Sequence, residues 1–97
     1  MIQREGERMR VSGPVTLATV AALLEEGRAQ IADGARTVDL GGIEELDSSA
    51  LAMLLAWLRE AKQRERELAF ENLPEGLTTI ARLYGVAELL AAAPKHH

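Results

Sequence analysis

The fold of this chain is decided by the stretch LDSSALAMLLAWL, residues Leu46–Leu58. Its polar triplet Asp47-Ser48-Ser49 opens directly into a long apolar run, as at the start of an amphipathic helix. Asp47 or Ser48 is a natural N-cap, because its side-chain oxygen can accept a hydrogen bond from a backbone N–H of the first turn. A cap uses only one of the three polar side chains, so the other two are candidates for a second role.

Successive residues of an α-helix are rotated by about 100° around its axis. With this rotation, the apolar residues of the helix that follows fall on two sides. One side is a leucine stripe, which we expect to press on a sheet: Leu51, Leu54, Leu55 and Leu58. Met53 and Trp57 fall nearly opposite and are predicted to face outward. Either Trp57 simply lies along neighbouring side chains, or it forms a docking site with Met53, since both residue types are enriched at interface cores.

Other segments show the patterns of strands. Alternation or short apolar runs predict strands at 8–12, 37–40 and 68–72, with Glu5-Gly6 able to turn a hairpin before the first of them. In that first strand, Met9 and Val11 should face the core.

Apolar residues at helical spacing predict two further helices. The first is capped by Thr16, and its buried stripe is Leu17, Val20, Ala21, Leu24 and Ile31. The second starts at Pro74 and ends at Gly85, and its buried stripe is Leu77, Ile80, Ala81 and Tyr84. Residues 86–91 are expected to form a last turn or strand.

Strands that alternate with helices predict an α/β layer structure with a mixed sheet. A length of 97 residues predicts one domain over 1–97, with 94–97 as a flexible tail. The absence of cysteine excludes a disulfide framework and thiolate chemistry. The net charge of −4, without a basic patch, argues against nucleic acid as a partner. Neither a signal peptide nor a membrane-spanning run is visible, so we expect a cytoplasmic protein.

The residues needed for catalysis or metal binding are missing from the pattern. A serine nucleophile needs a base in reach, and the two histidines, His96 and His97, stand at the chain end, where they are native or the remnant of a tag. They and the scattered carboxylates show no metal-ligand spacing. We therefore expect a protein that is not an enzyme and has no metal or cofactor. A hydroxyl in the first turn of the long helix remains a possible phosphoacceptor, because the helix dipole stabilises a phosphate there.

The strand Val38-Asp39-Leu40 and the following Asp47-Ser48-Ser49 with its leucine-rich helix resemble the STAS domain family, typified by anti-sigma factor antagonists. The late segment TIARLYGV, residues 79–86, is most similar to the MlaB type, a small subunit of the Mla phospholipid ABC transporters that act in outer-membrane lipid asymmetry. The resemblance implies a mixed sheet of about four strands with helices mainly on one face.

For function, the MlaB-type resemblance implies binding to the transporter's cytoplasmic ATPase, in a complex with a permease. The contact would use Asp47, Ser48 and Ser49 with the helix that they start, placing the domain at the inner membrane through its partner. Ser48 is the position that functions in the MlaB type. In the antagonists the equivalent of Ser49 is phosphorylated by a partner kinase, so the alternative is a partner-switching regulator controlled at Ser49. Ala50 departs from the glycine usual in those antagonists.

Overall fold

The computed structural model describes residues 1–91. Within them, one mixed sheet has the strand order β1-β2-β3-β4: β1 (Ile2–Glu5), β2 (Arg8–Val15), β3 (Thr37–Leu46) and β4 (Ala69–Glu71). The helices that alternate with these strands are α1 (Val20–Ala32), α2 (Ser48–Gln63), α3 (Glu75–Leu83) and α4 (Ala87–Ala91). The first two strands pair antiparallel, and the other two pairs are parallel. The predicted α/β class with a mixed four-stranded sheet is confirmed.

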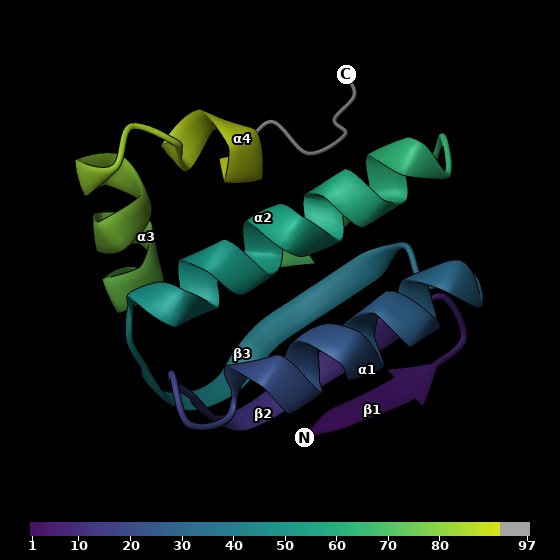
Figure 1. Ribbon diagram of the computed structural model, residues 1–97, viewed down its shortest axis with the longest axis horizontal. Coiled ribbons are helices and arrows are strands. Elements are labelled where there is room, and N and C mark those ends of the chain that lie inside the picture. The colour runs from purple at the N-terminus through teal and green to yellow at the C-terminus, as the bar shows by residue number, and fades with distance from the viewer. Residues whose placement is uncertain (92–97) are drawn as a thin grey trace.

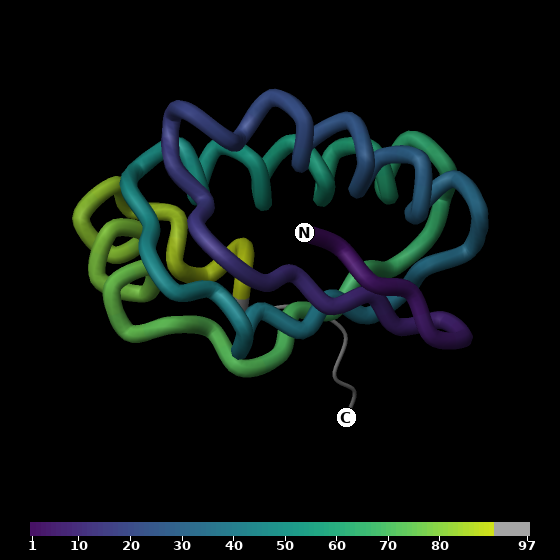
Figure 2. Tube along the Cα trace, turned by 90° about the horizontal axis from the view of Figure 1, so that it is seen from below, coloured from purple at the N-terminus to yellow at the C-terminus, as the bar shows by residue number. Residues whose placement is uncertain are grey.

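Helices α1 and α2 lie side by side on one face of the sheet (Figures 1 and 2). Helix α3 stands at the end of the sheet where α2 begins, and α4 turns back along the outer side of α2 (Figure 1). The predicted placement of helices mainly on one face is therefore confirmed. The predicted tail, 94–97, lies outside the described residues.

The first two strands form the predicted hairpin. Its turn contains Gly6, whose φ of 63° is a left-handed conformation that glycine adopts without steric cost. Met9 and Val11 are fully buried, as their alternation predicted. The strand continues beyond the predicted end, Ser12, to Val15, because its second half pairs with the long β3.

Helix α1 begins later than predicted. Thr16 is not the cap: its carbonyl accepts from the N–H groups of Thr19 and Val20, so residues 16–19 form a turn before the helix. That turn leaves Leu17 79% exposed, although it was predicted in the buried stripe. Ala21 is exposed too, and the fully buried positions of the helix are Leu23, Gly27 and Ile31.

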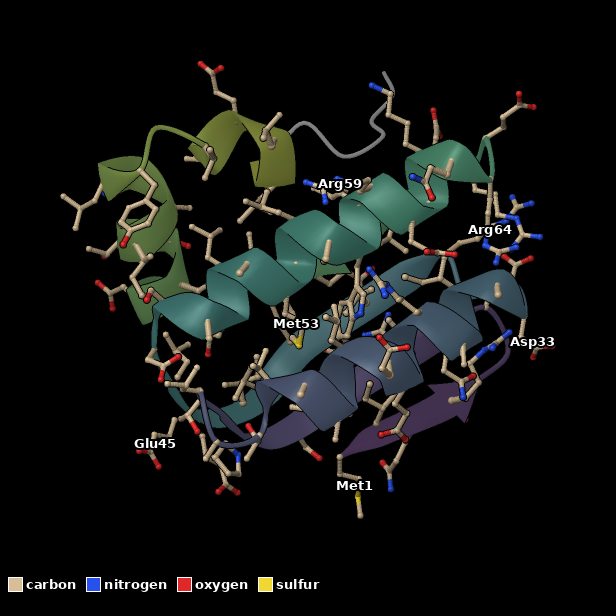
Figure 3. The ribbon with its side chains drawn as sticks, viewed as in Figure 1. Met1, Asp33, Glu45, Met53, Arg59 and Arg64 are labelled. Atoms are coloured by element: carbon tan, nitrogen blue, oxygen red, sulfur yellow. The ribbon has the colours of Figure 1, made fainter. Side chains whose placement is uncertain are left out.

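The outward orientation predicted for Met53 and Trp57 of α2 is wrong, although Leu51 and Leu54 of the expected core stripe are buried as predicted. Met53 is 1% exposed and Trp57 is completely buried, whereas Leu55 and Leu58 of the expected core stripe are only partly buried. Figure 3 shows Met53 on the side of α2 that faces α1 and the sheet. Two partners, the sheet and α1, cover α2 and widen its buried face toward α1. This face is Ala50, Leu51, Met53, Leu54, Trp57 and Ala61.

A small residue on the neighbouring helix makes room for the tryptophan. The indole Nε1 of Trp57 donates to the carbonyl of Leu24 at 3.1 Å, so its polar group is satisfied inside the core. The ring lies over Gly27, which carries no side chain to oppose it. Gly27 thus allows α1 and α2 to approach closely.

Between residues 74 and 91, the structure differs from the sequence prediction in two details. Helix α3 begins after Pro74 and is followed by Gly85 with φ of 73°, as its predicted start and end require. Tyr84, predicted to be buried, is 65% exposed. The segment after Gly85 forms the short helix α4 rather than a strand, and its Leu90 reaches the core.

Candidate functional site

Asp47 joins two parts of the chain at the start of α2. Its Oδ1 accepts from the backbone N–H of Ser49 at 2.9 Å and from the Ser49 hydroxyl, which makes Asp47 the N-cap that the sequence allowed. Its Oδ2 accepts from the backbone N–H of Leu17 at 3.0 Å. The Ser49 hydroxyl, followed by the two backbone donors, lowers the pKa of the Asp47 carboxyl. An ionised Asp47 therefore holds the β2–α1 turn against the first turn of α2.

The two serines of the triplet differ in how accessible they are. Ser49 is partly buried and its hydroxyl is engaged by Asp47. Ser48, the first residue of α2, is exposed. Of the two serines, Ser48 is therefore the more accessible to solvent.

A shallow apolar groove starts beside this exposed serine. It has a volume of about 330 Å³ and lies between α2 and the end of α3, and its lining residues are Ser48, Ser49, Leu51, Ala52, Leu55 and Tyr84. The exposed Leu17 is tied to the same end of α2 through Asp47. Polar hydroxyls, apolar side chains and an aromatic ring thus meet on one surface, which we call the motif groove.

The structure brings together only part of the predicted docking site. Asp47, Ser48 and Ser49 lie at or beside the motif groove, but Met53 and Trp57 are core residues and contribute nothing to a surface. Leu55 and Tyr84, which the sequence placed in buried stripes, line the groove instead. The signal that could have revealed Tyr84 is its position directly before Gly85, which makes it the C-cap of the helix rather than part of its buried stripe.

The opposite face of the sheet carries a separate polar cluster. Asp39 is 6% exposed and its carboxylate accepts from Arg8 at 3.0 Å, from the amide of Asn72 at 2.9 Å and from the N–H of Gly41 at 2.9 Å. The Asn72 hydrogen bond, then those of Gly41 and Arg8, lower the pKa of Asp39 to about 2. Arg8 also pairs with Glu71, so the cluster links β2, β3 and β4. Every carboxylate oxygen of Asp39 is used within the protein, which is the arrangement of a structural ion pair.

The described residues offer little else for chemistry. Among residues 1–91, no three histidine, cysteine or acidic side chains are grouped so that they could hold a metal ion. In that same part of the chain, no helix has the length and apolar character needed to cross a membrane.

Comparison with known protein families decides which fold family this is. The family model described as "Mlab, STAS domain" matches residues 1–91. The chain belongs to the MlaB-type STAS domain family. In this STAS domain, the Asp-Ser-Ser triplet beside the motif groove consists of Asp47, the residue between β3 and α2, and the first two residues of α2.

Solved structures support the same fold. The STAS domain superposes on the anti-sigma factor antagonist SpoIIAA in its unphosphorylated form with a TM-score of 0.69 and 16% identity, over 90% of this chain and 81% of that one. It also resembles part of the protein Mglu, with a TM-score of 0.56 and 22% identity, over 77% of this chain and 19% of that one. No curated protein matches the sequence closely enough to count as a relative. At these identities the structural likeness concerns the fold alone.

Proposed function

We propose that this STAS domain is a non-enzymatic subunit that docks on the cytoplasmic ATPase of an Mla-type phospholipid ABC transporter. It supports the assembly or activity of the ATPase in its complex with the permease, and so contributes to outer-membrane lipid asymmetry. The domain is held at the cytoplasmic side of the inner membrane through the ATPase. The family match over residues 1–91 supports the transporter class.

The observation that carries this proposal is the motif groove beside Ser48. A hydroxyl that is free to contact a partner adjoins apolar side chains that the core leaves partly uncovered, with the Tyr84 ring 65% exposed at the rim. Interface centres have this composition: aromatic and aliphatic side chains surround a few polar groups, and charged groups are few. A helix start adds backbone N–H groups that can bond to a partner's oxygen atoms.

The alternative function is a partner-switching regulator that is phosphorylated at Ser49. The contact between the Ser49 hydroxyl and Asp47 weighs against it, because a phosphate at this oxygen would place a dianion against a carboxylate with a lowered pKa. The exposed Ser48 carries no such conflict. We therefore favour constitutive docking over phosphorylation control.

Affinity measurements with paired variants test the proposal. Tyr84→Ala should weaken binding to the Mla-type ATPase at least tenfold in titration calorimetry, as truncation of an aromatic hot spot does. The matched control is Leu83→Ala, since Leu83 is 77% exposed on the neighbouring position but does not line the groove, and its affinity should stay within about twofold. Equal losses in both variants, or no loss in either, would place the contact elsewhere.

Serine variants separate the two functions. Ser48→Ala should reduce the affinity for the ATPase while leaving the thermal unfolding temperature unchanged. A regulator controlled at Ser49 requires the opposite pattern: Ser49→Asp would abolish partner binding, and incubation with a cognate kinase would add the mass of one phosphate to the intact chain.

A further inference from the structure

A second groove continues the motif groove along α2. It lies between the C-terminal half of α2 and α4, has a volume of about 350 Å³, and its lining residues are Leu55, Leu58, Arg59, Lys62 and Leu89. Leu55 lines both grooves, so together they follow the outer side of α2. Figure 3 shows Arg59 on this outer side, toward α4.

The floor of the second groove is apolar and partly uncovered. Leu55 and Leu58 are only partly buried, and Leu89 is 54% exposed. These three leucines form an apolar strip bordered by charged residues, on which the side chains of another protein segment can pack. Its position between two helices suits an amphipathic helix laid into a groove.

The charges at this groove have one sign. Arg59 and Lys62 are both exposed, and neither forms an ion pair with any described residue. The nearby acidic residue of α2, Glu60, lies on the other side of the helix, where it pairs with Arg64 at 2.8 Å and with Arg28 at 3.9 Å. Two unpaired cations thus border an apolar groove on a chain whose net charge is −4. Complementarity requires acidic side chains on whatever fills it.

Other occupants match this chemistry poorly. If a second copy of the chain packed groove to groove, Arg59 and Lys62 of one copy would lie against the same two cations of the other, and the like charges would repel. Residues 92–97 of the same chain contain Lys95 and no acidic residue. An anionic membrane would also meet two cations here, but a groove between two helices fits a helix better than it fits a flat lipid surface.

We propose that the groove of Leu55, Leu58 and Leu89, bordered by Arg59 and Lys62, seats an amphipathic acidic helix of the ATPase. This inference rests on the proposed function and extends it to a specific element of the partner. The apolar side chains of that helix enter between α2 and α4, and its aspartate or glutamate side chains pair with Arg59 and Lys62. The motif groove and this groove then form one continuous interface.

A charge-reversal experiment tests the inference. Arg59→Glu combined with Lys62→Glu should weaken binding to the Mla-type ATPase at least tenfold in 0.1 M salt, and the difference from the unmodified chain should shrink at 0.5 M salt as screening increases. The matched control is Arg10→Glu combined with Arg36→Glu, which shifts the net charge equally at two exposed positions outside both grooves. Circular dichroism checks that each variant folds, and the Gln pair at 59 and 62 replaces the Glu pair if folding fails.

The outcomes distinguish a failure of this inference from a failure of the proposed function. If the unmodified chain does not bind the ATPase, the proposed function and this inference both fail. If the unmodified chain binds and the two charge-reversed variants lose affinity equally, only the inference fails. Binding of the unmodified chain to anionic vesicles that is lost on reversal of Arg59 and Lys62, with unchanged ATPase affinity, assigns the groove to a membrane and also overturns the inference.

A photocrosslink identifies the segment directly. Benzoylphenylalanine placed at Leu89, which is 54% exposed on α4, should label one peptide of the ATPase after irradiation of the complex. We expect that peptide to be an amphipathic helix with acidic residues beside its apolar face. A labelled peptide without acidic residues, or no label on the ATPase in a complex that has formed, contradicts the inference.

Discussion

The indole ring of Trp57 occupies the space that a side chain at Gly27 would need. A Cβ added to Gly27 would lie 2.1 Å from Cζ2 of the ring, which is closer than such atoms approach in proteins. The same ring donates its N–H to the carbonyl of Leu24, three residues earlier in α1. This contact allows α1 and α2 to pack closely and places the Trp57 side of α2 in the core.

Gly27→Ala should destabilise the domain by about 2–3 kcal/mol. The added methyl overfills a packed interface, and this cost exceeds the gain of about 1 kcal/mol in helix propensity. Urea unfolding followed by tryptophan fluorescence measures the change. Gly76→Ala is the matched control, because Gly76 is an exposed helical glycine whose Cβ would meet only Leu46 Cδ1 at 3.8 Å. That variant should be neutral or more stable, and equal destabilisation of the two would contradict the packing.

Trp57→Ala should destabilise the fold itself, by about 3–5 kcal/mol, because it removes a completely buried aromatic side chain and leaves a cavity. Trp57→Phe should lose less, since the ring is mostly retained while the carbonyl of Leu24 loses a donor. Thermal unfolding by circular dichroism gives both values. Unaltered stability of Trp57→Ala would instead support the outward orientation of Trp57 that the sequence suggested.

Asp47→Ala should cost about 1 kcal/mol, the usual value of an N-cap, and should release the turn that contains Leu17. Faster amide hydrogen exchange is expected at both Leu17 and Ser49, whose N–H groups lose their acceptor. Ser48→Ala serves as the control, because Ser48 is exposed and is not the cap, so neither amide should change. Faster exchange at Ser49 alone would show that Asp47 caps the helix without holding the turn.

The folding stability of the domain should depend on pH through the protonation of Asp39. Its pKa is lowered from 3.8 to about 2 in the fold, so the folded state binds fewer protons than the unfolded state in this range. The resulting stabilisation is fully present above about pH 4 and is lost as the pH falls through 2. Unfolding temperatures of the unmodified chain and Asp39→Asn, compared between pH 7 and pH 2, should converge toward the acid end.

A surface carboxylate provides the control for this pH dependence. Asp33 pairs with Arg4 at 3.3 Å, but its side chain is 80% exposed, and such pairs add little to stability. The unfolding temperature of Asp33→Asn should therefore equal that of the unmodified chain at every pH. If the unfolding temperature of Asp39→Asn also equals that of the unmodified chain at every pH, the cluster of Asp39 with Arg8 and Asn72 contributes no stability.

The sequence predicted most of the architecture, because short-range signals specify it. Alternation placed Met9 and Val11 in the core, and the polar triplet marked the start of α2 with Asp47 as one of its two candidate caps. Signals of this kind depend on neighbours along the chain. They do not require knowledge of which strands or helices pack together.

The orientation of α2 was predicted wrongly because two stripes compete along it. The leucine stripe is the more hydrophobic, but continuing it at helical spacing reaches Lys62, whereas the stripe through Met53 and Trp57 runs from Ala50 to Ala61. Small residues at both ends, together with Gly27 inside α1, indicate two helices in close contact. Reading Gly27 as a packing position would have placed Trp57 against it.

The polar cluster on the open face could not be predicted from local pattern. Asp39 meets Arg8 from β2 and Asn72 from beyond β4 only because the sheet sets these strands side by side. Likewise, Tyr84 and Leu55 meet at the motif groove only after α3 has packed at the start of α2. Both features depend on contacts between segments far apart in the sequence.

Hydrogen–deuterium exchange of the domain with and without the Mla-type ATPase maps where the ATPase binds. If it docks on the motif groove, backbone amides in the turn of Leu17, in the first turns of α2 and around Tyr84 should exchange more slowly in the complex. Protection confined to the open face of the sheet, at Gln3, Arg10 and Asp39, would contradict docking on the motif groove, as would an unchanged exchange pattern in a complex shown to have formed.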